Sequence, residues 1–415
     1  MPAEMPLPTE GHCRSCGEPG LQTFLSLGST PLADALVRPE DADAPEAHFP
    51  LDVAFCPNCA LVQILEEVPA EQLFVDNYLY FSSFSDELLR HSREHALGLV
   101  EGRGLDSGSL VVELASNDGY LLKNFAEQGI PVLGVDPAPD QAEAANAAGI
   151  PTLAEFFGPE LAERILDEHG PADVIIANNV MAHVPDLNGF VAGMAELVAE
   201  DGLITVENPY VRDLITHCEF DTIYHEHFCY YSCTAVDALV RRHGMFLNDV
   251  EYFPNLHGGT LRWHIQPFEN VSERAASMLE AERRDGLDTF GYYASFGERV
   301  EEIRRELLKL LGELRDSGAS IAAYGAAAKG STLLNYMGIG TDLLDYVVDR
   351  NVHKQGLLMP GVHVPIKDPS ALLEEQPDYV LLLAWNFTEE IISQQSEYLD
   401  RGGRFITPIP RPEIL

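Results

Sequence analysis

The chain has very few lysines: five among 415 residues, against 66 aspartates and glutamates, which leaves a formal net charge of −40. Such a field repels nucleic acids and anionic membranes, so we expect neither as a partner. An acidic, lysine-poor surface stays soluble in concentrated salt, where counterions screen its self-repulsion. We therefore expect a halophilic source.

The sequence also lacks long apolar runs. No stretch of about 20 apolar residues occurs, and residues 1–11 contain neither a basic nor an apolar segment. These absences predict a soluble, cytoplasmic protein. Seven cysteines, an odd number without a secretory signal, argue against a disulfide framework. The length indicates two to three domains.

Four of the cysteines form two C-x-x-C pairs, a spacing that lets both thiolates of a pair reach one tetrahedral zinc ion. A redox site would not need the second pair. Because Arg14 is the only basic residue before Arg38, a nucleic-acid-binding zinc ribbon is disfavoured. We predict a structural, closed zinc site whose ligands are Cys13, Cys16, Cys56 and Cys59.

The middle of the chain lacks the G-x-G-x-x-G turn of dinucleotide-binding proteins. Residues 110–114 read as a buried strand, 115–119 as a turn of sequence ASNDG, and 132–136 as a second strand ending at Asp136. A strand, a turn, a helix and a strand ending in an acid form a Rossmann-type unit, whose acid hydrogen-bonds a ribose. S-adenosylmethionine (SAM) has no pyrophosphate that would require the glycines. The turn therefore favours SAM over NAD.

A further strand, residues 172–178, delivers two asparagines at its carboxyl end, where open α/β sheets bind ligands. Periodicity alone favours a packing role for Tyr78, but we include it in the predicted cofactor site. That site comprises Tyr78, Glu113, Ala115, Asn117, Gly119, Asp136, Pro137, Asn178 and Asn179.

Residues 224–228, Tyr-His-Glu-His-Phe, concentrate proton-transfer groups in one stretch. Alone, they fit a buried polar cluster as well as an active site. In a regular strand Tyr224 and Glu226 would face away from His225 and His227, so convergence of the first two with His227 requires another conformation. Same-face histidines at positions 225 and 227, with cysteines nearby, also leave a metal site open.

The last third of the chain reads as a second α/β unit. A helical face occupies residues 296–314, and strands are predicted at 320–325, 344–349 and 379–386. The first strand runs into GAAAKGST, which is not a Walker A motif. A lysine at a helix start opposes the helix dipole unless an anion joins it, so Lys329 predicts a phosphate site.

Several of these motifs together resemble the sugar C-methyltransferases of deoxysugar biosynthesis, and the resemblance covers nearly the whole chain. It rests on the paired C-x-x-C motifs and on ELASNDGYLL, GVDPA, NNVMAHV, EFDTIYHEHFCYYS and YGAAAKGSTLLNY. The resemblance implies an α/β protein with a zinc-binding N-terminal domain, a class I SAM-binding middle domain and a Rossmann-like C-terminal domain. We place the domains at residues 1–70, 71–285 and 286–415.

In that family SAM methylates C-3 of a nucleotide-linked keto-deoxysugar. The resemblance implies that His227 is the base, with Tyr224, Glu226 and His183 around the sugar. It also implies that Lys329, Tyr324 and Asn386 face the nucleotide diphosphate, with dTDP as the expected nucleotide. Carbon is a poor nucleophile, so a C-methyltransferase needs a base to form an enolate and donors where negative charge develops.

Two other functions remain open from the sequence. A related methyltransferase could act on another acceptor, such as a glycan, because a fold does not fix its substrate. The other is a non-catalytic scaffold that binds SAM or a nucleotide sugar, although the retained His, Tyr, Glu and Lys residues speak against it. We expect a monomer or a weak homodimer.

Overall fold

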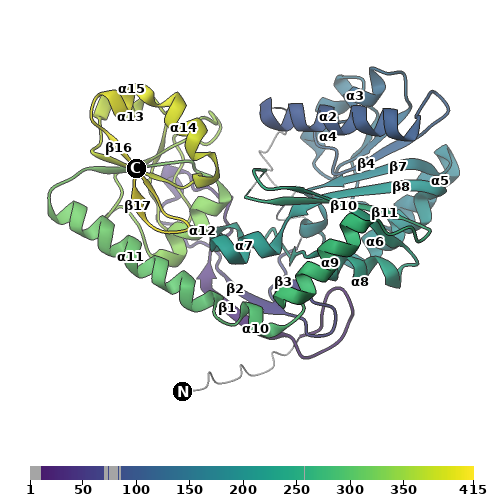
Figure 1. The fold of residues 1–415 in the computed structure, drawn as a ribbon. Helices are drawn as coiled ribbons and strands as arrows, with labels where there is room; N and C mark the ends of the chain where they lie inside the picture. The colour runs from purple at the N-terminus through teal and green to yellow at the C-terminus, as the bar shows by residue number, and fades with distance from the viewer. Residues whose placement is uncertain (1–10, 70–72, 74–82, 84–85, 257) are drawn as a thin grey trace.

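The computed structural model describes residues 11–69, 73, 83, 86–256 and 258–415, which form three β-sheets (Figure 1). The α/β architecture and the three-part organisation are as predicted, and each predicted strand lies within a few residues of an observed one. No described helix is both long and apolar enough to cross a membrane.

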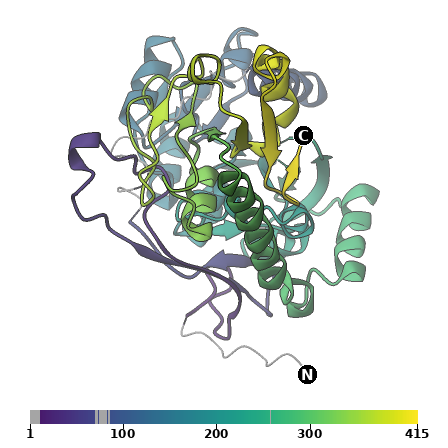
Figure 2. The same ribbon diagram turned by 90° about the vertical axis from the view of Figure 1, so that its left-hand side faces the viewer.

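The first sheet, here called the zinc sheet, is antiparallel with the order β1-β2-β3-β9. Its first three strands come from the N-terminal region, whereas the fourth comes from the middle of the chain. Figure 2 shows the N-terminal strands running along the bottom of the molecule. The strands are β1 (Gln22–Thr30), β2 (Phe49–Phe55), β3 (Val62–Ile64) and β9 (Cys229–Tyr230). The predicted domain boundary at residue 70 therefore stays a prediction, because one sheet joins both sides of it.

The second sheet, the middle sheet, has seven strands in the order β10-β11-β8-β7-β4-β5-β6. Its five strands from β8 to β6 are parallel, and β7 is apolar and buried through its centre, as expected for a strand covered on both faces. The strands are β4 (Val111–Leu114), β5 (Val132–Val135), β6 (Thr152–Leu153), β7 (Ala172–Asn178), β8 (Val198–Pro209), β10 (Phe246–Phe253) and β11 (Thr260–Gln266).

Helices cover both faces of the middle sheet (Figure 1). One face carries α2 (Asp86–Arg103), α3 (Lys123–Ala126) and α4 (Pro139–Ala147). The other carries α5 (Pro159–His169), α6 (Leu187–Leu197) and α8 (Cys233–Arg242). Parallel strands covered in this way leave their carboxyl ends free for a ligand.

The third sheet, the C-terminal sheet, has the order β14-β13-β12-β15-β16-β17, with only the last pair antiparallel. The predicted long helix is α11 (Phe296–Asp316), and α12 (Ala328–Met337) follows the first strand. The strands are β12 (Ile321–Tyr324), β13 (Val347–Val348), β14 (Ile366–Lys367), β15 (Tyr379–Leu382), β16 (Arg404–Thr407) and β17 (Glu413–Ile414).

Shorter elements join the three sheets. Between β8 and β9 lie α7 (Val211–His217) and the 3-10 helix η4 (Phe220–Thr222), which packs on α12. After β11 the chain forms α9 (Glu273–Asp285) and α10 (Phe290–Tyr293) before α11. As a result, the segment that carries the Tyr-His-Glu-His stretch is held against both the zinc sheet and the C-terminal unit.

Candidate active site

A cavity of about 480 Å³ lies at the carboxyl ends of β4, β5, β7 and β8. All three parts of the chain contribute to its wall: Asp34 from the N-terminal region, many residues from the middle region, and Lys329 and Asn386 from the C-terminal region. The volume suits a small-molecule site.

The cofactor end of this cavity is the turn after β4. Ala115 and Asn117 adopt left-handed backbone conformations, with φ of 56° and 50°. The carboxylate of Asp136 accepts a hydrogen bond from the Asn117 N–H (2.8 Å) and another from the Ala138 N–H (2.9 Å). The acid predicted to bind a ribose thus also holds the turn in place. Six residues of the predicted cofactor site line the cavity: Ala115, Asn117, Asp136, Pro137, Asn178 and Asn179.

Two further residues of the predicted cofactor site, Glu113 and Gly119, do not line the cavity. Glu113 is buried, and burial together with the charges of Asp136 and Asp118 raises its pKa well above the ordinary value. Gly119, with φ of 77°, packs against Ile150. Tyr78 lies outside the described residues.

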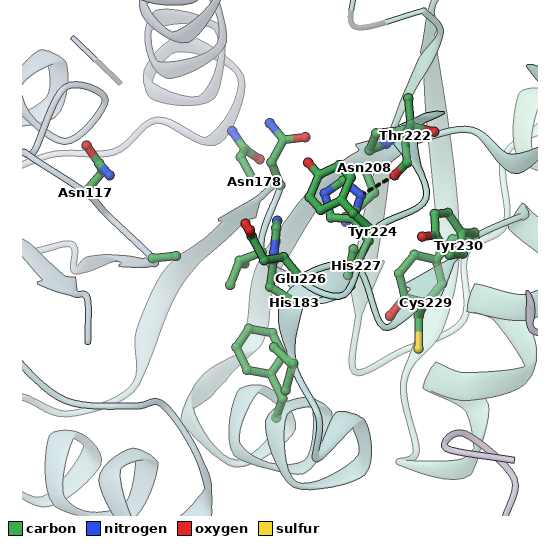
Figure 3. A pocket seen from close by; sticks show the side chains of 18 of the residues that line it. Asn117, Asn178, His183, Asn208, Thr222, Tyr224, Glu226, His227, Cys229 and Tyr230 are labelled. Atoms are coloured by element: carbon green, nitrogen blue, oxygen red, sulfur yellow. Dashed lines mark hydrogen bonds between the residues drawn. The ribbon is translucent and has the colours of Figure 1, made fainter. Parts of the chain in front are cut away.

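The stretch at 224–228 is a turn, not a strand. The His227 N–H donates to the Tyr224 carbonyl (2.9 Å), and the Phe228 N–H donates to the Ala182 carbonyl (2.7 Å). Tyr224, Glu226 and His227 all line the cavity, together with His183 from the 3-10 helix Met181–His183 (Figure 3). The four predicted catalytic residues therefore lie close together. The turn conformation allows this convergence, which a regular strand would prevent.

His227 is fixed in one tautomer. Its Nδ1–H donates to the Thr222 carbonyl at 2.8 Å, drawn as the dashed line in Figure 3, which leaves Nε2 with a lone pair. Burial and then the neighbouring His183 lower the pKa of His227 well below its ordinary value. The imidazole is consequently neutral at neutral pH and can accept a proton.

His225 lies on the opposite side of the same turn. It is 1% exposed, its Nε2–H donates to the Pro50 carbonyl (3.0 Å), and its ring contacts Phe49 edge-on. The zinc sheet thus supports the turn from behind. Among the described residues, the four N-terminal cysteines form the one group of His, Cys, Asp and Glu side chains that could hold a metal ion, so the alternative metal site at His225 and His227 is not supported.

Burial favours the neutral forms of two further predicted catalytic residues, His183 and Glu226. Burial lowers the pKa of His183 to about 4, and its ring centroid lies 4.7 Å from that of His227. Burial, and next the charge of Asp34, raises the pKa of Glu226 well above its ordinary value, while Lys354 acts in the opposite direction. Burial therefore favours the protonated form of Glu226, which can donate a hydrogen bond.

Lys329 lines the cavity but already has partners within the protein. Its Nζ donates to Asn386 Oδ1 (3.0 Å) and lies 4.7 Å from the centre of the Trp385 ring. The buried acids Asp221 and Glu219 attract its charge. Asp221, with a pKa of about 6, is the acid of the two that is largely ionised at neutral pH, whereas Glu219, with a pKa of about 8, is largely protonated. The phosphate site stays a prediction.

Tyr324 does not line the cavity. It lies in β12 and packs with Tyr346, Val348 and Leu382 in a separate core cluster of the C-terminal unit. Asn386 and its neighbour Phe387 do line the cavity.

Sequence reasoning missed several residues of the cavity wall. Asn208 follows Glu207 at the carboxyl end of β8, so the strand-end rule that found Asn178 would also have found it. The others, for which no local pattern provides a signal, include Tyr230, Cys229, Phe156 and Phe157.

The metal position matches the prediction. The four Sγ atoms of the N-terminal cysteines lie within 4.8 Å of one another, with Cys13–Cys59 at 3.5 Å and Cys16–Cys56 at 3.6 Å. Tetrahedral zinc bonded to sulfur at about 2.3 Å sets sulfur atoms roughly 3.8 Å apart. The cysteines therefore fit a closed zinc site.

Comparison with known proteins agrees with this arrangement. Family models match in chain order: a zinc binding domain (residues 13–74), a methyltransferase domain (82–247) and a C-methyltransferase C-terminal domain (255–410). The C-methyltransferase NovU of Streptomyces niveus is 38% identical over 407 residues, which are 97% of this chain and 96% of that protein. The chain belongs to this C-methyltransferase family.

More distant matches are confined to part of the chain. The ubiquinone biosynthesis O-methyltransferase of Caulobacter sp. (strain K31) is 32% identical over 120 residues, or 28% of this chain and 48% of that protein. The magnesium protoporphyrin IX methyltransferase of Synechocystis PCC 6803 with bound SAM covers 47% of this chain and 88% of its own, at 14% identity and a TM-score of 0.34.

The protein is thus a SAM-dependent methyltransferase with a four-cysteine zinc site. The cavity fits the cofactor, because it combines a ribose-type acid, a left-handed turn and Asn178, whose buried Oδ1 has no hydrogen-bond partner among the described residues. SAM supplies an electrophilic methyl group, and this chain must supply the nucleophile's environment.

Proposed function

We propose that this enzyme methylates a carbon next to the ketone of a nucleotide-linked keto-sugar, with C-3 of a dTDP-linked deoxysugar as the expected acceptor position. The observation that carries the proposal is the fixed tautomer of His227, which presents a neutral Nε2 to the cavity that the cofactor turn also lines.

In the proposed reaction His227 Nε2 removes the proton from the carbon beside the ketone. The electron pair of the broken C–H bond forms the enolate double bond, and the ketone π electrons move onto oxygen. The enolate carbon would then bond to the methyl group of SAM, while the electron pair of the broken S–C bond stays on sulfur to give S-adenosylhomocysteine and the ketone forms again. The protonated His227 would release its proton to solvent. A buried, neutral imidazole suits this step because it is unprotonated before the substrate arrives.

Donors around His227 support the developing oxyanion. Glu226 as a neutral acid and the Tyr224 phenol both line the cavity, and neither adds a negative charge near the enolate. The Tyr224 and His227 rings lie 4.1 Å apart, so the phenol and the base face the same volume. Such donors are needed for carbon methylation, whereas an oxygen acceptor needs far less help.

Lys329 and Asn386 would meet the polar end of the acceptor at the C-terminal side of the cavity. Because the charge of Asp221 already acts on Lys329 and Asn386 already accepts its hydrogen bond, we propose a hydrogen-bonding role for Lys329 in place of full neutralisation of a diphosphate. Tyr324 is outside the cavity and takes no part in this binding.

The test is incubation with SAM that carries a ¹³C-labelled methyl group and a panel of dTDP-linked keto-sugars, with products examined by carbon NMR. The expected product carries the label on a carbon bonded to carbon. A label on oxygen or nitrogen, or no transfer to any keto-sugar while other acceptors react, would overturn the proposal.

A further inference from the structure

Asn208 is an unusual residue of the cavity wall. It stands at the carboxyl end of β8, is 1% exposed, and lines the cavity. Neither its Nδ2 nor its Oδ1 has a hydrogen-bond partner among the described residues. Figure 3 shows its side chain in the same part of the site as Thr222, Tyr224 and His227, away from Asn117.

Two other buried asparagines among the described residues, Asn124 and Asn248, are bonded. Asn124 Nδ2 donates to the Leu121 carbonyl at 2.9 Å. Asn248 donates through Nδ2 to Gln266 Oε1 (3.1 Å) and to the Phe268 carbonyl (2.9 Å), and its Oδ1 accepts from the Asn270 N–H (2.8 Å). These amides act as structural connectors. Asn208 makes no such connection, and a buried amide without partners destabilises the fold.

The chemistry of the unpaired amide indicates its ligand. One side chain presents a two-proton donor and an acceptor side by side, which complements a carbonyl oxygen next to a hydroxyl group. Keto-sugars carry this pair, and a purely apolar acceptor does not. The neighbouring strand end contributes Asn178, whose position pairs with Glu207, so Asn208 lies one residue beyond the cofactor-side amide.

We propose that Asn208 binds the methyl acceptor directly: Nδ2–H donates to the ketone oxygen on which the enolate charge develops, and Oδ1 accepts from an adjacent hydroxyl. This inference rests on the proposed function, since it needs an acceptor that enolises. It makes Asn208 a catalytic residue, because it stabilises charge on a reacting atom.

The test compares Asn208→Ala and Asn208→Asp with the wild type, using a dTDP-linked 4-keto-deoxysugar as the probe. Deuterium uptake from D₂O into the acceptor, measured with S-adenosylhomocysteine present, reports enolisation without methyl transfer. We expect uptake and kcat to fall by about 10²-fold in Asn208→Ala, the loss typical of one oxyanion donor. Asn208→Asp should fall at least as far, because a carboxylate repels the enolate.

The same variants should bind SAM with a Kd within about twofold of the wild type, and should keep or raise the Tm, since the amide makes no internal bond to lose. The matched control is Asn248→Ala, which removes a bonded structural amide. It should lower the Tm and leave deuterium uptake per folded molecule unchanged. If Asn208→Ala does not fold, Asn208→Thr tests the same loss of the amide.

Unchanged uptake in Asn208→Ala would overturn the inference, and so would weakened SAM binding with normal uptake, which would assign the amide to the cofactor. A His227→Asn variant in the same assay separates this inference from the proposed function. If His227→Asn keeps full uptake, the base assignment fails. If His227→Asn loses deuterium uptake and the Asn208 variants keep it, the assignment of His227 as the base holds and the assignment of Asn208 fails.

Discussion

The turns after β4 and β12 share one hydrogen-bonding arrangement and differ in the side chains that follow it. In each, an acid at the end of the neighbouring strand accepts one hydrogen bond from the turn and one from the residue two positions beyond itself. Asp136 accepts from Asn117 (2.8 Å) and Ala138 (2.9 Å). Asp349 accepts from Ala326 (2.7 Å) and Asn351 (2.8 Å).

The difference lies in what each turn does with its helix start. The turn after β4, residues 115–119, opens on the cavity and contains no lysine or arginine, and Lys123 at the start of α3 does not line the cavity. The turn after β12 places Lys329 in a buried group with Asn386, Trp385 and Asp221, in which the Trp385 Nε1–H donates to Asp221 Oδ2 at 2.7 Å. The same hydrogen-bonding arrangement therefore occurs at two kinds of site. In the middle unit the turn lines the ligand cavity, and in the C-terminal unit the turn leads into the buried Lys329 group, which also reaches the cavity.

The largest expected effect comes from removing the positive charge of the buried Lys329 group. Lys329→Met removes the buried cation whose charge acts on Asp221 and Glu219, so we expect the free energy of unfolding to fall by about 3 kcal/mol at pH 9. Burial raises the pKa of Glu219 to about 8 and that of Asp221 to about 6, while Lys329 lowers both. Acids with raised folded-state pKa values stabilise the fold at low pH and lose that contribution as pH rises.

The destabilisation should therefore shrink below pH 6, where both acids are protonated. Denaturant unfolding of the wild type and of Lys329→Met at pH 9 and pH 5.5 checks this. Asn386→Ala is the control, because it removes one neutral partner and should cost about 1 kcal/mol at both pH values. If Lys329→Met lowers the free energy of unfolding equally at the two pH values, an electrostatic interaction between Lys329 and the two acids would be contradicted.

The next effect separates the two acids. Asp136→Ala should weaken SAM binding about 30-fold, because it removes a cavity-lining acid and frees the Asn117 N–H. Asp349→Ala loses the equivalent bonds away from the cavity, so its effect should appear in the Tm and not in the Kd for SAM. Calorimetric titration of both variants decides the point, and equal weakening would mean that the two turns do not divide their roles.

A smaller effect concerns the pH dependence of kcat/KM, which reports the protonation state of His227, the proposed base. His227 must be neutral to accept a proton, and burial with His183 holds its pKa below the ordinary value. The acid limb of kcat/KM should consequently lie below about pH 6.5, the unperturbed value for histidine. A limb at or above about pH 7, measured with dTDP-keto-sugar as the varied substrate, would contradict the buried, neutral state.

The smallest expected effect, counted per residue, is the salt dependence of the Tm that the acidic surface produces. It involves neither turn. With a net charge of −40, the Tm should rise steadily from low salt to molar KCl as screening relieves repulsion. A Tm that is highest at low salt would exclude the halophilic interpretation.

Local sequence patterns predicted much of the fold. Apolar runs ending in Asp136 and Asn178 predicted parallel strands with ligand-facing ends, and the spacing of the cysteines predicted the zinc site. The strands could be predicted because a buried strand is marked by a local apolar run. The zinc site could be predicted because each C-x-x-C pair is a local signal, although 40 residues separate Cys16 from Cys56.

The rest of the site depends on contacts between distant segments. The zinc sheet takes its fourth strand, β9, directly after the turn at residues 224–228, and the Ile64 N–H donates to the Phe228 carbonyl at 3.0 Å. The sequence does not reveal that the zinc region holds this turn, nor that Asp221 and Glu219 balance Lys329. Charge balance between segments so far apart in the chain follows from packing and not from local pattern.

The most direct test of the central claim is deuterium uptake from D₂O into a dTDP-linked keto-sugar, compared among the wild type, His227→Asn and His225→Asn with S-adenosylhomocysteine present. We predict uptake next to the ketone in the wild type, loss of at least about 10²-fold in His227→Asn, and near-normal uptake per folded molecule in His225→Asn, which should show only a lower Tm. Full uptake in His227→Asn would contradict the claim that this imidazole is the base.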